Sequence, residues 1–198
     1  MIYIVDDEPA VRRALDRLLR ASGYEVTVFD SASDFLANKP DASPACLVLD
    51  IAMPGLSGLE VQEALAGENS LLPIIFLTGR ADVPMCATAM KRGAVDFLTK
   101  PVKDSDLIAA VDRALDLSRH RHQQREECLG IDERLARLTP REREVLELVV
   151  TGLLNKQIAA QLGIAEKTIK VHRGRVMEKM SVKSVAELVG LMDRLKMR

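Results

Sequence analysis

Four apolar residues that run into a single carboxylate, Cys46–Asp50, constrain the fold of this chain more than any other segment. Turn-forming residues follow at once, in the sequence Ile51-Ala52-Met53-Pro54-Gly55. A continuous run of β-favouring residues is typical of a strand buried on both faces of a parallel sheet. Ligands of open α/β sheets bind just beyond the carboxyl ends of the strands, so we expect chemistry at Asp50.

The same pattern of an apolar run followed by a polar end recurs along the first half of the chain. It predicts four further strands, at residues 2–5, 24–29, 73–79 and 94–100. Helical periodicity lies between them, first in the stripe Val11, Ala14, Leu15, Leu18 and Leu19. Later helices are expected after Ser31, after the Ser57 and Glu60 capping box, over residues 82–92 and through residues 107–115. Strands that alternate with helices predict an α/β fold with a doubly wound, five-stranded parallel sheet.

Polar residues gather where these strands end. The predicted strand ends carry Asp6 and Asp7, Asp50, Thr78 and Lys100. Converging carboxylates repel one another, and Mg²⁺ prefers one or two carboxylates together with water and phosphate oxygens. A carboxylate beside a metal can attack phosphorus and form an acyl phosphate. Lys100 and Thr78 can then pair with the phosphoryl oxygens, so the pattern indicates phosphoryl transfer onto Asp50.

Charge divides the chain into two parts. Residues 1–116 carry a formal charge of −7 and residues 117–198 carry +6, which suggests different partners and makes nucleic acid a candidate for the second part. No apolar run reaches the roughly 18 residues that a membrane-spanning helix needs. The three cysteines have no metal-type spacing, and a strand-like segment begins at Ile2. We therefore expect a cytoplasmic protein without a signal peptide or a membrane association.

The basic part has helix-start signals and short turns. Thr139, Pro140 and Glu142 predict a helix with a capping box, and Asn155 is expected to cap the next helix. A turn at residues 163–165 then leads to a helix at residues 166–180, which completes a helix-turn-helix pattern. On a helical wheel, one side of that helix collects Ile169, Arg173, Val176 and Met180. The opposite, mostly basic side collects Lys167, Lys170, Val171, Gly174, Arg175 and Glu178 and suits a DNA major groove.

The first half resembles the receiver domain of two-component response regulators, in particular the FixJ branch. The resemblance lies in Asp6-Asp7, in the segment from Asp50 to Gly58, in Thr78-Gly79 and in Lys100-Pro101. It implies that Asp50 is the phosphoacceptor and that Mg²⁺ is bound by Asp7, by Asp6 through water, by Asp50 and by the carbonyl of Ala52. It also implies a cis Lys100-Pro101 bond and an aromatic switch that couples Phe97 to Thr78.

Residues 138–198 resemble the LuxR/NarL-type DNA-binding domain, in the stretches 138–142, 155–159 and 168–173. This implies base contacts from Lys170, Val171 and Gly174 and phosphate contacts from Lys156 and Thr168, with Lys167 and Arg175 on the same face. The expected division is a receiver at 1–118, a helical linker at 119–137 and a DNA-binding domain at 138–198. The expected function is phosphorylation-controlled transcription regulation, not an enzyme. The implied partners are a sensor histidine kinase, double-stranded DNA, RNA polymerase and, after phosphorylation, a second copy of the chain.

Several alternatives stay open at this point. An Asp-nucleophile phosphatase also forms an aspartyl phosphate, but it needs a second acid where this chain has Ala52. The basic domain could instead bind protein or RNA, or dock on the acidic half. Phe97 could be an ordinary core residue, and His120 with His122 could be solvated rather than metal-binding. Two departures have no assigned effect: Arg80 near the phosphoryl entrance and Gly174, which has no side chain to read DNA.

Overall fold

The computed structural model describes residues 1–39, 44–79 and 83–196, and the chain divides into two compact units, residues 1–123 and 124–198. The first unit contains a five-stranded parallel sheet with the strand order β2-β1-β3-β4-β5. Its strands are β1 (Ile2–Val5), β2 (Val26–Phe29), β3 (Cys46–Asp50), β4 (Ile74–Thr78) and β5 (Asp96–Thr99). The expected doubly wound α/β fold is therefore confirmed.

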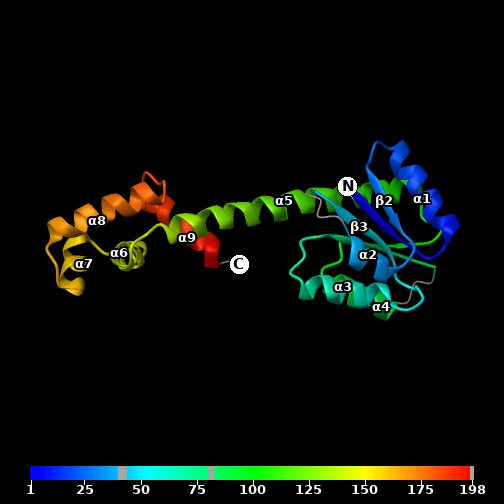
Figure 1. Cartoon of the computed structure of the whole chain (residues 1–198), viewed down its shortest axis with the longest axis horizontal. Helices are drawn as coiled ribbons and strands as arrows, with labels where there is room; N and C mark the ends of the chain where they lie inside the picture. Colours follow the sequence, from blue (N-terminus) through cyan, green and yellow to red (C-terminus); the bar gives the residue numbers. More distant parts are fainter. Residues whose placement is uncertain (40–43, 80–82, 197–198) are drawn as a thin grey trace. The chain divides into compact units, whose positions relative to one another are not determined.

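Helices cover both faces of this sheet, as the expected strand and helix alternation requires. They are α1 (Pro9–Ala21), α2 (Ala32–Asn38), α3 (Gly58–Gly67), α4 (Val83–Lys91) and α5 (Asp104–Ala136). Ile2 and Ile4 of β1 pack with residues of α1 and α5, whereas Tyr3 and Val5 face the side covered by α2, α3 and α4 (Figure 1). Alternate residues of one strand thus serve two cores, which explains the continuous apolar runs.

Two details of the predicted helices differ from the structure. Leu15 and Leu19 of α1 are buried, but Ala14 is exposed, so the apolar stripe is narrower than predicted. Helix α5 continues without interruption to Ala136. Leu107 of α5 is buried in the core that α1 and α5 form with the sheet, whereas Ile131 of α5 is buried in the core of the second unit. The start expected at Asp82, and Arg80 beside it, lie outside the described residues.

The second unit is helical. After the end of α5 it contains α6 (Pro140–Val150), α7 (Asn155–Leu162), α8 (Glu166–Lys179) and α9 (Val185–Lys196). The capping box of Thr139 and Glu142 at the start of α6 is confirmed. The expected cap at Asn155 is wrong: Leu154 occupies the N-cap position, and its backbone N–H donates to Gln157 Oε1. No helix in the described ranges is both long and apolar enough to cross a membrane.

Candidate functional site

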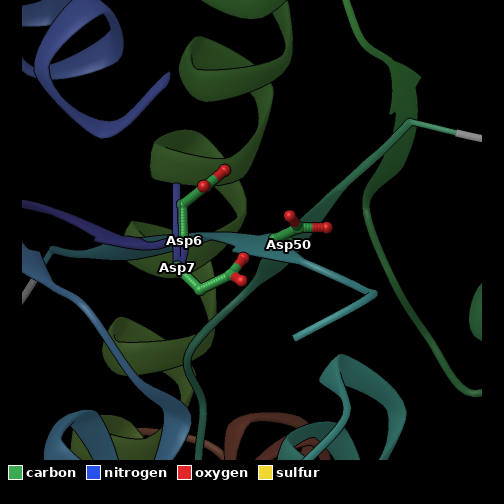
Figure 2. Close-up of side chains that lie close together, drawn as sticks. All are labelled: Asp6, Asp7 and Asp50. Carbon is green, nitrogen blue, oxygen red and sulfur yellow. The ribbon is translucent and has the colours of Figure 1, made fainter. Parts of the chain in front are cut away.

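The carboxyl ends of β1 and β3 bring three aspartates together. Asp6 and Asp7 directly follow β1, and Asp50 is the last residue of the adjacent strand β3. Figure 2 shows Asp6 and Asp7 leaving neighbouring backbone positions in different directions, with Asp50 beside them. One carboxylate oxygen from each residue lies within 4.8 Å of the other two. The sequence prediction that these three carboxylates meet at one edge of the sheet therefore matches the geometry.

Lys100 lies among these carboxylates. Its Nζ atom is 2.6 Å from Asp50 Oδ2 and 2.8 Å from Asp6 Oδ2, and it also lies 3.2 Å from Glu8 Oε1. Lys100 follows β5, so the contact joins one outer strand of the sheet to the two central strands that carry Asp6 and Asp50. A backbone hydrogen bond to the neighbouring strand β4 holds Lys100 in this place: its N–H donates to the carbonyl oxygen of Thr78 at 2.7 Å.

Burial and charge act in opposite directions on these groups. Burial raises the pKa of Asp6, although hydrogen bonds from Lys100 and from the backbone of Glu8 act to lower it. For Lys100, burial disfavours the charged form, but the hydrogen bonds to Asp50 and Asp6 outweigh it and its pKa is raised. Lys100 is therefore a stable cation that holds two buried carboxylates next to each other.

The remaining predicted residues surround Asp50. Its Oδ1 atom accepts a hydrogen bond from the backbone N–H of Ala52 at 3.1 Å. Thr78 is buried at the end of β4, the strand beside β3. Phe97 of β5 is half-buried and packs against Phe76, with the ring centroids 6.3 Å apart. The Lys100-Pro101 peptide bond is cis, as expected.

The donor set suits a hard divalent cation. All three side-chain donors are carboxylate oxygens, which Mg²⁺ prefers, and no nitrogen or sulfur ligand is present in this group. Among the described residues it is the one group of three or more metal-binding side chains close enough to share an ion. His120 and His122 are accordingly not part of such a group.

Two residues that shape this site, Glu8 and Gly58, carry no site assignment from the sequence. Glu8 belongs to the acidic run after β1, and its contact with Lys100 depends on a pairing across 92 positions. Gly58, the first residue of α3, approaches the chain at Asp50 so closely that an added Cβ would lie 2.8 Å from the Asp50 carbonyl oxygen. Adjacency to Asp6 and Asp7 was an available signal for Glu8. No sequence signal distinguished Gly58 from an ordinary turn glycine.

The second unit exposes the residues predicted to face DNA. Ile169 and Val176 of α8 are buried, and the opposite face of this helix is exposed. All seven predicted contact residues lie on the surface: Lys156 on α7, and Lys167, Thr168, Lys170, Val171, Gly174 and Arg175 on α8. Val171 is an exposed apolar residue, 48% accessible, among basic neighbours. This surface provides the cationic and apolar groups that major-groove recognition uses.

Polar contacts fix α8 within its unit. Arg173 Nη1 donates to Asn155 Oδ1 at 2.9 Å and ties α8 to the start of α7. Lys179 Nζ lies 2.6 Å from Oε2 of Glu142, whose side chain is 2% exposed, and so ties α8 to the start of α6. Lys179 and the backbone N–H of Thr139 lower the pKa of Glu142 to about 2. These ties hold the exposed face of α8 in one orientation on the helices beneath it.

Comparisons with known proteins find a family match for each half of the chain. Residues 2–112 match the family described as the response regulator receiver domain, and residues 136–192 match the bacterial regulatory proteins of the luxR family. Nodulation protein W of Bradyrhizobium diazoefficiens is 45% identical over 98% of this chain and 86% of its own length. The transcriptional regulatory protein FixJ of the same organism is 42% identical over 98% of this chain and 94% of its own.

Solved structures give the same result. The response regulator StyR is similar with a TM-score of 0.85 and 46% identity, and the match covers 98% of each chain. Full-length FixJ from B. japonicum has a TM-score of 0.60 and 42% identity over 100% of this chain and 97% of that one. The chain therefore belongs to the response regulators, as a transcriptional regulator of a two-component system with a receiver domain and a LuxR-type DNA-binding domain.

Proposed function

We propose that Asp50 accepts a phosphoryl group from a sensor histidine kinase and that this modification controls DNA binding through α8. One observation carries the proposal: the carboxylates of Asp6, Asp7 and Asp50 converge at one edge of the sheet, with the ammonium group of Lys100 between two of them. A nucleophilic carboxylate, further oxygen ligands and a fixed cation are the groups that phosphoryl transfer needs.

The proposed transfer forms one bond and breaks one. A carboxylate oxygen of Asp50 attacks phosphorus, the P–O bond forms, and the P–N bond to the kinase histidine breaks, so that an acyl phosphate remains on Asp50. Lys100 exchanges its contact with Asp50 Oδ2 for one with a phosphoryl oxygen, and the buried Thr78 hydroxyl donates to another. The backbone N–H of Ala52, which already donates to Asp50 Oδ1, orients the nucleophile.

Mg²⁺ is the proposed cofactor, which the side chains of Asp7 and Asp50, the carbonyl oxygen of Ala52 and, through water, Asp6 would hold. The all-oxygen donor set supports this assignment. When bound, the ion neutralises charge on the transferring phosphoryl group. The three aspartates would otherwise repel an incoming phosphate, and Lys100 supplies only one positive charge against them.

Thr78 and Phe97 are the residues proposed to respond to phosphorylation, and α8 is the helix whose DNA binding they would change. Phe97 is half-buried beside β4, and a shift of Thr78 toward the phosphoryl group would change the space available to it. We propose that this favours a homodimer, whose two copies of α8 bind two half-sites more tightly than one. The exposed residues Lys156, Lys167, Thr168, Lys170, Val171, Gly174 and Arg175 would contact double-stranded DNA. RNA polymerase is a further proposed partner, and the bacterial cytoplasm the proposed location.

The proposed division of labour keeps the receiver at 1–118, the helical linker at 119–137 and the DNA-binding domain at 138–198. Family matches over residues 2–112 and 136–192 support the two functional parts. An Asp-nucleophile phosphatase is a weaker candidate, because Ala52 cannot act as the general acid that would protonate a leaving group.

Phosphorylation with a small phosphodonor tests the proposal. The wild type, Asp50→Asn and Asp30→Asn are incubated with acetyl phosphate and Mg²⁺, and intact mass is measured. Asp30 is a matched control because it is an exposed aspartate directly after β2, at the same edge of the sheet. We expect one phosphate on the wild type and on Asp30→Asn and none on Asp50→Asn. Equal labelling of Asp50→Asn would refute the assignment, and repeated turnover of a phosphomonoester would favour the phosphatase.

A further inference from the structure

Glu8 gives Lys100 a third carboxylate partner at the opening of the site. A lysine ammonium group has three N–H donors, and in the described part of the chain Lys100 contacts the carboxylates of Asp50, Asp6 and Glu8. The side chains of Asp6 and Asp50 are 0% and 5% exposed, whereas that of Glu8 is 60% exposed. Glu8 therefore holds Lys100 from the solvent side, and the two aspartates hold it from within.

The backbone fixes Glu8 in this place. Its N–H donates to Asp6 Oδ1 at 2.9 Å, so the residue is tied to one of the buried carboxylates. Glu8 also occupies the N-cap position of α1, where a side chain usually accepts a hydrogen bond from the helix. Here the Glu8 side chain makes no capping bond and instead reaches Lys100. Its carboxylate therefore serves Lys100 and not the helix.

Phosphoryl transfer places conflicting demands on Lys100. In this structure its Nζ atom lies 2.6 Å from Asp50 Oδ2, whereas the other carboxylate oxygen of Asp50, Oδ1, accepts the hydrogen bond from the Ala52 N–H. The ammonium group has to leave Asp50 for the transfer, yet it has to stay near the entering phosphoryl group. A carboxylate at the opening can hold it during this exchange, at a place that neither Asp6 nor Asp50 can offer.

We propose that Glu8 is a positioning residue for phosphorylation, which holds the Lys100 ammonium at the opening of the site while Asp50 is released for attack. This inference rests on the proposed role of Asp50. It makes Glu8 favourable for the reaction, although its negative charge also repels the phosphodonor. We expect the positioning effect to be the larger of the two, because Glu8 contacts Lys100 directly, whereas its repulsion of the phosphodonor acts through solvent at an exposed side chain.

The two effects of Glu8 change different rate parameters. Loss of positioning lowers the maximum rate at saturating acetyl phosphate, whereas loss of repulsion lowers the half-saturating concentration. For Glu8→Gln we expect the maximum rate to fall about two- to fivefold, the range that an exposed ion pair provides, with at most a smaller decrease in the half-saturating concentration. Glu8→Asp keeps the charge on a shorter side chain and should recover part of the rate.

The experiment measures phosphorylation of the full chain by acetyl phosphate with Mg²⁺, over a range of donor concentrations. Glu25→Gln is the matched control, because Glu25 is exposed and lies before β2, at the opposite edge of the sheet. A second readout needs no phosphodonor: the ¹⁵N resonance of the Lys100 ammonium group in metal-free protein. It should shift in Glu8→Gln and remain in place in Glu25→Gln.

The outcomes separate this inference from the proposed function. A Glu8→Gln variant that is phosphorylated as fast as the wild type, or faster, overturns the positioning role. So does a Glu8→Asp variant slower than Glu8→Gln, because a carboxylate at this position would then hinder the reaction. In both cases Asp50→Asn would still remain unphosphorylated, and the assignment of Asp50 would stand. Phosphorylation of Asp50→Asn would instead remove the basis of the proposed function.

Discussion

At the scale of single residues, Gly58 shows how closely the site is packed from behind. Its backbone N–H donates to the carbonyl of Ile51, which draws the first turn of α3 onto the segment that follows Asp50. A Cβ atom there would lie 2.8 Å from the Asp50 carbonyl oxygen and 2.9 Å from Ile51 Cα, which is closer than ordinary packing allows. The backbone of Asp50 and Ile51 therefore lies so close to the start of α3 that only glycine fits at position 58.

We expect Gly58→Ala to lower the free energy of unfolding by about 1–3 kcal/mol, because an inserted methyl group overpacks a rigid backbone contact. Gly67→Ala is the matched control at the other end of α3, where nothing lies within 4 Å of an added Cβ. That change should be neutral or stabilise by about 0.5–1 kcal/mol. Urea unfolding of both variants measures the difference, and equal stability would contradict the overpacking argument.

Lys170 allows a residue-scale test of the DNA-facing surface. It is exposed on α8 and is one of the residues that we propose to contact DNA. Lys170→Ala should weaken binding to a duplex selected by the wild type by about 1–3 kcal/mol, measured by fluorescence anisotropy. Lys183→Ala removes an equal charge from the segment between α8 and α9 and should have a smaller effect. Equal losses would mean that Lys170 contributes only through general charge.

At the scale of elements, the sequence predicted the strand order along the chain, the helix starts at Ser57 and Thr139 and the convergence at Asp50. These features depend on local patterns: apolar runs, capping residues and polar strand ends. The contact of Glu8 with Lys100 depends on pairing between distant segments, which no local pattern records. The same reason explains Asn155, which was expected to cap α7 but accepts a hydrogen bond from Arg173 of α8.

Helix α5 runs through a segment whose composition gives little sign of a packed helix. Residues beyond 117 are rich in charged and polar side chains, and this composition favoured a partly helical linker. In the structure Ser118 is fully buried, and its Oγ atom accepts a hydrogen bond from the Ala45 backbone N–H. Ile131 is buried in the other core. Ser118 thus anchors this helix in the first unit, whereas Ile131, with Leu135 packed nearby, anchors its end in the second unit.

The contact between α6 and α8 makes the second unit sensitive to acid. The pKa of Glu142 is lowered to about 2 in the folded chain, from an ordinary value of 4.5. A carboxylate with a lowered pKa stabilises the fold above its unfolded pKa, and this stability is lost as the pH falls through the folded value. We therefore expect the second unit to lose stability progressively from about pH 5 down to about pH 2.

Glu142→Gln should remove this part of the pH dependence and lower stability at neutral pH by about 1–3 kcal/mol. Glu144→Gln is the control, because Glu144 forms an exposed ion pair with Arg141 that contributes little. The chain has no tryptophan, and both tyrosines, Tyr3 and Tyr24, lie in the first unit, so intrinsic fluorescence does not report on the second unit. Amide hydrogen exchange in α8 is therefore the appropriate measurement. A Glu142→Gln variant with the wild-type acid profile would contradict the assignment.

At the scale of the whole molecule, the boundary between the two compact units falls within the sequence of α5, after residue 123. The last turns of α5 belong to the second unit by their contacts: Ile131 is 2% exposed, and Arg134 Nη1 donates to the Met180 carbonyl at 3.2 Å. A DNA-binding fragment that starts at residue 138 would lack both. The proposed functional boundary at residue 138 therefore falls inside the second compact unit, which begins at residue 124.

We expect a fragment of residues 138–198 to be less stable than one of residues 124–198 by about 2–5 kcal/mol, the cost of losing a buried isoleucine. Thermal unfolding followed by circular dichroism compares them. In the full chain, Ile131→Ala should reproduce most of the loss, whereas Leu129→Ala, at a residue that is 49% exposed, should not. Fragments of equal stability would show that α5 contributes nothing to the fold of the second unit.

The continuation of α5 past the family match also bears on solubility. Ala114, Leu115 and Ser118 lie beyond residue 112 and are buried in the first unit. A receiver trimmed at residue 112 would lose these side chains and uncover the sheet face beneath them, leaving an apolar patch open to water. Such a trimmed receiver would tend to aggregate, whereas one that continues through residue 123 would keep that patch covered.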